Sequence, residues 1–248
     1  MSMNDAGGDP RDKAFTAPGR QTPRNGDVKE VVMSDTTPAP ERPSRPVVTL
    51  FESYGSGASY IGPRVAQELG VPFHPQAFSS EEIENAMVER ESEGLLSQVF
   101  SAMGGQYLGI EGGSVAMAQQ DKYDLVMENT RKVVEDARQG GVIIGRNGAL
   151  ILADWPGALH VKLDGPLSQR IERAAQDSGI DIERAAKRQK REDQVRADMS
   201  IELYGWDPRE TERYDLMVNT GTMDLDTCVD IIVQAVKVKA GFQGATSP

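Results

Sequence analysis

The sequence predicts an α/β protein in which helices cover both faces of a parallel β-sheet. Short, β-branched apolar runs of strand length alternate with longer segments that show helical periodicity. Because helical segments alternate with the strands along most of the chain, most connections are long enough to cross over the sheet and join parallel strands. The alternation starts at about Val47 and ends at about Lys239. We therefore expect one folded domain over residues 47–242.

Five strands and six helical segments can be placed along this domain. The strands are expected at residues 47–51, 71–73, 142–145, 158–163 and 214–218. Helical patterns cover residues 60–69, 79 to about 102, 114–139, 167–177, 181 to about 203, and 224–239. Ser79 and Glu82 have the spacing of a capping box at the start of the second helix. A glycine-rich loop is expected over residues 103–113.

The first 46 residues differ from the rest of the chain in amino-acid composition. They are rich in Pro, Gly, Asp, Arg and Thr and have almost no apolar periodicity. Such a segment buries too little apolar surface to offset the entropy of ordering it. We expect a disordered tail over residues 1–46, with a true start nearer Met33 as one variant and a partner-binding or targeting arm as the alternative. Residues 243–248 are expected to form a flexible C-terminus.

Charge and composition exclude several classes of function. The net charge is −11, and residues 1–46 contain seven basic and seven acidic side chains, so the excess lies on the folded part. An acidic surface repels the nucleic-acid backbone, and we expect no nucleic-acid partner. No apolar run approaches the roughly 18–20 residues of a membrane span. A chain whose one cysteine is Cys228 suits a reducing cytoplasm. The oligomeric state is not predicted.

A glycine loop follows the first strand. Residues 52–59 read Glu-Ser-Tyr-Gly-Ser-Gly-Ala-Ser and lead directly into a helix. A loop in this position places backbone N–H groups and a helix N-terminus around phosphate oxygens. The Walker A pattern is G-x-x-x-x-G-K-[ST], and this chain has Glu52 at the first glycine and Ala58 at the lysine. Phosphate binding is favoured by the position of the loop, and a tight turn without a ligand is the alternative.

A cluster of basic side chains occupies the predicted helix at residues 181–203. Five basic residues lie within ten positions of an otherwise acidic protein: Lys187, Arg188, Lys190, Arg191 and Arg196. Arg188 and Arg191 share one helix face, and Glu192 and Arg196 are four residues apart. A solvated helix with ion pairs is one interpretation. The clustering favours the other, a mobile lid that closes over phosphates.

An ordered set of motifs is similar to the cytidylate kinase-like family, a divergent branch of the nucleoside monophosphate kinases. The motifs are Tyr54-Gly55-Ser56-Gly57, residues 142–146 (VIIGR), residues 165–170 (GPLSQR), residues 193–196 (DQVR) and residues 214–220 (YDLMVNT). They occur in the family's order between Val47 and about Val238. The resemblance implies a P-loop NTPase-type three-layer sandwich with a five-stranded parallel sheet in the order 2-3-1-4-5. It also implies ATP and Mg²⁺ as donor and cofactor, nucleotides as substrates, and CMP or dCMP as the leading acceptor.

The resemblance also implies roles for individual residues. The donor phosphates would lie on the loop residues Gly55, Ser56, Gly57, Ala58, Ser59 and Tyr60. Arg146, next to Gly145 at the carboxyl end of a central strand, would hold the acceptor monophosphate. A structural ion pair with an acidic residue such as Asp154 is the alternative role for Arg146. Catalytic groups would come from a lid at about residues 181–206: Arg188, Arg191 and Arg196, with Asp193 orienting Arg196 or Arg191.

The chain departs from the family pattern around the glycine loop. The family tends to have a Gly-Arg pair after the second loop glycine, where this chain has Ala58-Ser59. The family commonly has an arginine just before the Tyr-Gly-Ser-Gly turn, where this chain has Glu52. It usually has an acidic residue after the second strand, where this chain has Pro75. We therefore predict a kinase, with a pseudokinase-like nucleotide-binding protein that lacks useful turnover as the alternative. No Cys/His metal spacing is present, and His160 is expected to be a packed core residue.

Overall fold

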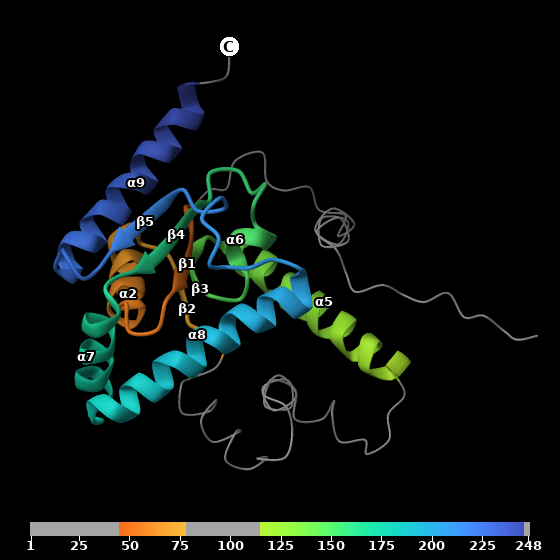
Figure 1. Cartoon of the computed structure of the whole chain (residues 1–248). Helices are drawn as coiled ribbons and strands as arrows, with labels where there is room; N and C mark the ends of the chain where they lie inside the picture. The colour runs from red at the N-terminus through yellow and green to blue at the C-terminus, as the bar shows by residue number, and fades with distance from the viewer. Residues whose placement is uncertain (1–44, 78–114, 246–248) are drawn as a thin grey trace, which may run out of the picture.

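Five parallel strands form one sheet in the order β2-β3-β1-β4-β5 (Figure 1). The strands are β1 (Val47–Glu52), β2 (Phe73–His74), β3 (Gly141–Ile144), β4 (Leu159–Asp164) and β5 (Leu216–Asn219). The computed structural model describes residues 45–77 and 115–245, with side chains over residues 45–77 and 123–239. The predicted parallel sheet and its strand order are confirmed. The expected helix from Ser79 and the loop at residues 103–113 lie outside the described residues, as do residues 1–44.

The helices form a layer on each face of the sheet (Figure 1). They are α2 (Ala58–Leu69), α5 (Val115–Gln139), α6 (Gly148–Ile151), α7 (Leu167–Ser178), α8 (Ile182–Tyr204) and α9 (Leu225–Ala245). Helices α2 and α9 pack on one face, and α5 and α6 pack on the other. Helix α8 passes across the carboxyl-terminal ends of the strands (Figure 1). Within the described ranges, no helix is long and apolar enough to span a membrane.

Two apolar cores explain why the strands read as continuous hydrophobic runs. Val48 and Leu50 of β1 point into the core shared with α2 and α9, whereas Val47 belongs to the core shared with α5 and α6. Neighbouring β3 divides in the same way, with Val142 on the first side and Ile143 on the second. A parallel sheet buried on both faces needs apolar side chains in both directions. The three-layer sandwich is therefore encoded by the composition of its central strands.

The elements differ from the sequence predictions at several boundaries and by one additional helix. Strand β2 lies at residues 73–74 rather than 71–73, and β5 begins at Leu216 rather than at Tyr214. Tyr214 instead packs its ring against Phe51 and Trp206, with ring centroids 6.0 and 6.1 Å apart. The four-residue helix α6 was not predicted, because a single turn has no periodicity to detect. Helix α9 continues beyond the expected end at residue 239 to Ala245.

Candidate functional site

The glycine loop joins the carboxyl end of β1 to the first turn of α2. Gly55 and Gly57 have φ angles of 78° and 89°, in the left-handed region that favours glycine. A Cβ atom at residue 55 would also lie 2.2 Å from the backbone oxygen of Arg170. Glycine is therefore required at residue 55 both for the backbone conformation and for the close packing of α7.

Four backbone N–H groups of the loop form two pairs with different surroundings, while those of Ser53 and Ser56 donate to backbone oxygens. Those of Gly57 and Ser59 have no hydrogen-bond acceptor among the described residues. Those of Tyr54 and Ala58 donate to carboxylates: the Tyr54 N–H to Asp193 Oδ1 at 2.7 Å, and the Ala58 N–H to Glu52 Oε1 at 3.3 Å. Free N–H groups at a helix N-terminus are suited to binding an anion. The N–H groups of Gly57 and Ser59 therefore remain available to a phosphate, whereas those of Tyr54 and Ala58 already bond to carboxylates.

The side chains of the loop residues have different positions. The hydroxyl of Ser56 is buried and donates to the Leu163 backbone oxygen at 3.1 Å, so it supports the loop. The Tyr60 hydroxyl donates to Asp226 of α9 at 2.8 Å. Ser59 is exposed and lines an open cleft above the loop. Of the predicted donor-binding residues with a hydroxyl, Ser59 is the one whose side chain faces that cleft.

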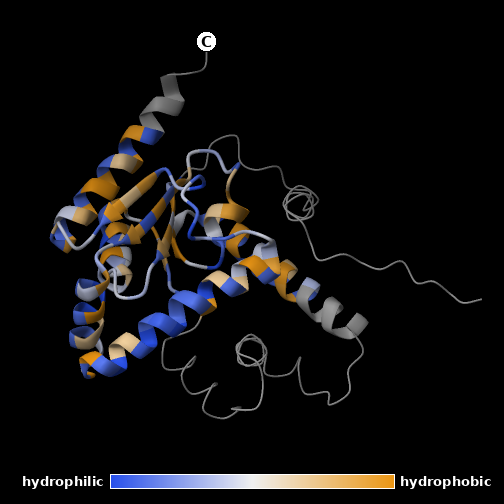
Figure 2. Cartoon of the chain, viewed as in Figure 1, coloured by the Kyte–Doolittle hydropathy of each residue, from blue (hydrophilic) through white to orange (hydrophobic). Residues whose placement is uncertain are grey.

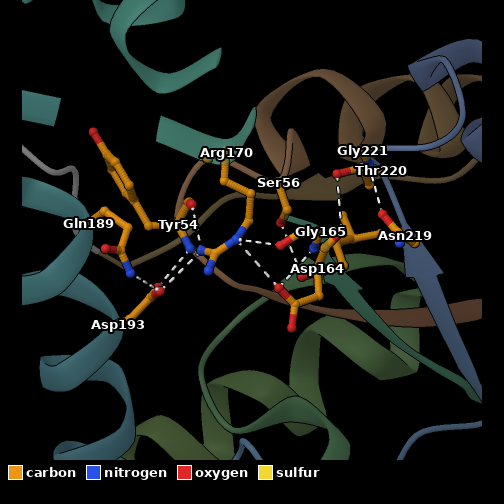
Figure 3. A network of polar contacts seen from close by, with 12 residues as sticks. Tyr54, Ser56, Asp164, Gly165, Arg170, Gln189, Asp193, Asn219, Thr220 and Gly221 are labelled. Atoms are coloured by element: carbon orange, nitrogen blue, oxygen red, sulfur yellow. Dashed lines mark hydrogen bonds and ion pairs between the residues drawn. The ribbon is translucent and has the colours of Figure 1, made fainter. Parts of the chain in front are cut away.

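Two arginines of α7 donate hydrogen bonds to carbonyl groups of the loop. Neither was predicted as a site residue from the sequence. Arg170 donates to the Tyr54 backbone oxygen at 2.9 Å and to Asp193 Oδ2 at 3.1 Å (Figure 3). Arg173 donates to the Gly55 backbone oxygen at 2.9 Å. These bonds hold the loop in one shape between α7 and α8. Arg170 ends the motif at residues 165–170, which was the available signal.

Asp193 connects α8 to the glycine loop. It accepts hydrogen bonds from the Tyr54 N–H, from Arg170 and, at 2.7 Å, from Gln189 (Figure 3). The nearest guanidinium nitrogen of Arg196 lies 3.9 Å from Asp193 Oδ1. The close partner of Arg196 is Glu192, at 2.9 Å. The shortest contacts of Asp193 are to the loop, to α7 and to Gln189, and its ion pair with Arg196 is longer, so its role in orienting Arg196 or Arg191 stays a prediction.

Helix α8 carries charged side chains inside its buried stripe. Arg188 and Glu192 are buried, three and seven positions after the buried Ala185. The surface of α8 is otherwise strongly hydrophilic along much of its length (Figure 2). Lys187 and Lys190 are exposed, as a solvated helix face requires. The predicted basic cluster is thus divided, because part of it faces water and part of it lies against the domain.

Two cavities meet below α8. The first is an open cleft of about 570 Å³ over the glycine loop. The second has a volume of about 140 Å³ and lies between the ends of β1 and β3 and helix α8, with four aromatic side chains in its wall: Phe51, Tyr204, Trp206 and Tyr214. Four residues line both cavities: Glu52, Gln76, Ile144 and Arg196. Arg188 and Arg191 line neither of them.

A chain of three hydrogen-bonded polar side chains lines both cavities. Arg196 donates to Gln76 Oε1 at 3.3 Å, and Gln76 donates through its amide nitrogen to Glu52 Oε2 at 3.0 Å. The three residues come from α8, from the segment after β2 and from the end of β1. Gln76 was not predicted, because one glutamine in a loop gives no sequence signal. A guanidinium at this position faces both cavities and could contact phosphates in either.

Arg146 follows β3 in a turn of unusual backbone conformation. Gly145, Arg146 and Asn147 have φ angles of 68°, 53° and 56°, and such values are uncommon for residues other than glycine. The Arg146 guanidinium donates to Asp136 Oδ2 at 2.9 Å and to the Pro75 backbone oxygen at 2.7 Å, and it lines the smaller cavity. The structural ion pair considered above is thus present, with Asp136 as the partner.

His160 lies in the core, as predicted. It is buried in β4, and its Nδ1 atom lies 2.8 Å from the Thr49 hydroxyl. Burial lowers the pKa of His160 to about 4, because the charged form loses its hydration. The imidazole is therefore neutral at physiological pH and belongs to the structure of the sheet.

Side chains that could hold Mg²⁺ are not clustered in the part of the chain that the structure describes. The described residues contain no group of three or more His, Cys, Asp or Glu side chains that could hold a metal ion. Mg²⁺ in phosphoryl-transfer sites is held mainly by substrate phosphates, water and one or two protein oxygens. Ser59 occupies the Ser/Thr position of the Walker pattern, and its exposed hydroxyl meets that smaller requirement.

A parallel sheet in the order 2-3-1-4-5, with a glycine loop between β1 and α2, defines a P-loop NTPase-type kinase fold. Comparison with known protein families assigns the chain to one family within this fold. The chain belongs to the cytidylate kinase-like family, whose family model matches residues 47–222. The resemblance stated from the sequence motifs is confirmed.

The individual relatives include a cytidylate kinase matched over most of its length and a protein of another name matched over part of its length. A cytidylate kinase from Ignicoccus hospitalis is 29% identical over 190 residues, which cover 75% of this chain and 96% of that protein. A protein named uronate isomerase from Corynebacterium glutamicum is 40% identical over 110 residues, but the chain spans only 21% of its length. A crystal structure of an uncharacterized protein from Eubacterium ventriosum has a TM-score of 0.55 at 18% identity, covering 79% of this chain and 99% of that one. This last likeness concerns the fold alone.

Proposed function

We propose that this kinase-like protein transfers the γ-phosphate of ATP to CMP, dCMP or a related small acceptor. The observation that carries the proposal is the meeting of two cavities at Arg196. A donor in the open cleft and an acceptor in the smaller cavity would bring their phosphates together at this guanidinium. Phosphoryl transfer needs mainly positioning and charge stabilisation from the protein, and this arrangement supplies both.

Each cavity has features that suit its proposed ligand. The free N–H groups of Gly57 and Ser59 would bind the donor phosphates. The Ser59 hydroxyl would hold Mg²⁺ together with those phosphates, and the ion when bound supplies charge neutralisation. The aromatic wall of the smaller cavity would pack against a nucleobase, with Arg146 beside the acceptor phosphate.

A nucleotide-binding protein without useful turnover is the second candidate. The observation that favours it is the charge of the loop, where Ala58 replaces the lysine of the Walker pattern and Glu52 adds a carboxylate. In P-loop enzymes that lysine stabilises charge on the β- and γ-phosphates. Arg196 is the described cation that could take over this role, because it lines both cavities.

A coupled kinase assay across all nucleoside monophosphates, with ATP and Mg²⁺, separates the two candidates. The proposal predicts turnover that depends on the acceptor, with CMP or dCMP preferred. Binding of ATP without turnover on any monophosphate would support the second candidate. Absence of both binding and turnover would contradict the two candidates together.

A further inference from the structure

Two side-chain carboxylates occupy places in the glycine loop that suit the oxygens of a phosphate. Glu52 accepts the N–H of Ala58, the first residue of α2, and Asp193 accepts the N–H of Tyr54. Phosphate oxygens and carboxylate oxygens compete for the same backbone donors at a helix N-terminus. In the structure, the protein's own anions have taken part of the anion site.

The two carboxylates are held differently. Asp193 has three short contacts, including the guanidinium of Arg170, which balances its charge. Glu52 has a 3.3 Å bond to the Ala58 N–H and a 3.0 Å bond from the neutral amide of Gln76. Both of these donors are uncharged. Asp193 therefore belongs to the structural support of the loop, whereas Glu52 is the less firmly held anion.

The surroundings of Glu52 make its charge unfavourable. Burial raises its pKa, and the charges of Glu192 and Asp193 act in the same direction. Arg196 opposes this shift, but its closest carboxylate partner is Glu192. A phosphate placed on the same loop would add further negative charge within a few ångströms of Glu52, and like charges at that distance repel.

We propose that Glu52 is an internal competitor for the donor's phosphate groups and so sets the affinity of the glycine loop for nucleotides. The inference rests on the donor site of the proposed function. In the structure, Glu52 accepts the Ala58 N–H and lines both cavities. A bound donor would have to take over this N–H and displace the carboxylate. Glu52 thus acts as a residue that determines affinity on the donor side.

The test is calorimetric titration of ADP and ATP into four full-length proteins: wild type, Glu52→Gln, Glu52→Ala and Glu68→Gln. Glu68 is an exposed residue near the other end of α2, so its variant removes the same charge away from the loop. We expect both Glu52 variants to bind about tenfold more tightly, as removal of a nearby like charge allows. The Glu68→Gln protein should match wild type. Thermal melting checks that each variant is folded.

The outcomes separate this inference from the proposed function. Tighter binding by either folded Glu52 variant supports the inference. Equal or weaker binding by both variants, with clear binding by wild type, overturns the inference and leaves the proposed function intact. Failure of all four proteins to bind ADP or ATP overturns both.

Discussion

Arg146 is held by contacts that an acceptor phosphate would have to share or replace. Its guanidinium bonds to Asp136 and to the backbone oxygen of Pro75. We predict that Arg146→Ala weakens binding of the acceptor monophosphate by about 1.5–3 kcal/mol, the range for a hydrogen bond to a charged group. ATP binding should change much less. Calorimetric titration of both ligands measures the difference, with Lys190→Ala as the control because Lys190 is exposed on α8.

The structure also changes the expected effect of this substitution on stability. An arginine that bound only a ligand phosphate could be replaced with little loss of stability. Loss of the Arg146 guanidinium, however, would take a 2.9 Å ion pair from the half-buried Asp136, whose other carboxylate oxygen lies 3.3 Å from His74. We therefore expect a loss of about 1–3 kcal/mol in the free energy of unfolding. Unchanged monophosphate affinity in a folded variant would assign Arg146 to the structural ion pair alone.

We predict that the free energy of unfolding depends on pH through the protonation of His160. Burial depresses its pKa in the folded protein to about 4 from the ordinary value of 6.5. The neutral form therefore stabilises the fold above about pH 6.5, and this contribution is lost as the pH falls through about 4. Urea unfolding at several pH values should show a smaller acid-induced loss of stability for His160→Gln than for wild type. Equal losses would mean that His160 is not kept neutral by the fold.

At the scale of elements, the contact between α8 and the loop depends on Asp193. We predict that Asp193→Asn lowers the free energy of unfolding by about 1–3 kcal/mol, because Arg170 loses a charged partner and the Tyr54 N–H loses a charged acceptor. The matched control is Glu183→Gln, whose ion pair with Lys187 is exposed to solvent and therefore contributes little to stability. Urea denaturation compares the two. Equal effects would indicate that Asp193 does not fasten α8 to the loop.

The elements differ in how well the sequence predicts them. The strands β1, β3 and β4 are recognisable because they are buried on both faces and read as apolar runs. Helix α6 and strand β2 are too short to carry a period. The bonds from Arg170 and Arg173 to the loop carbonyls cannot be read from spacing, because they join residues more than 100 positions apart. The strands that carry the glycine loop and Arg146 were therefore predictable, but the contacts among the side chains around them were not.

At the scale of the whole molecule, the acidic domain and the N-terminal segment are expected to be independent. We predict that deletion of residues 1–44 leaves the melting temperature and any nucleotide affinity nearly unchanged, because this sequence has no core-forming pattern. Differential scanning calorimetry and nucleotide titration of the full chain and the truncated chain test this. A fall of several degrees on deletion would show that the segment packs on the domain.

The central claim is that phosphate passes between two ligands that meet at Arg196. The most direct measurement is transfer of labelled γ-phosphate from ATP to CMP or dCMP by wild type, Arg196→Ala and Lys190→Ala. The account predicts transfer by wild type, a loss of about a hundredfold or more in Arg196→Ala, as for removal of a group that stabilises transition-state charge, and near-normal transfer in Lys190→Ala. Equal transfer by all three proteins would contradict it, because the guanidinium at the junction of the cavities would then have no part in the reaction.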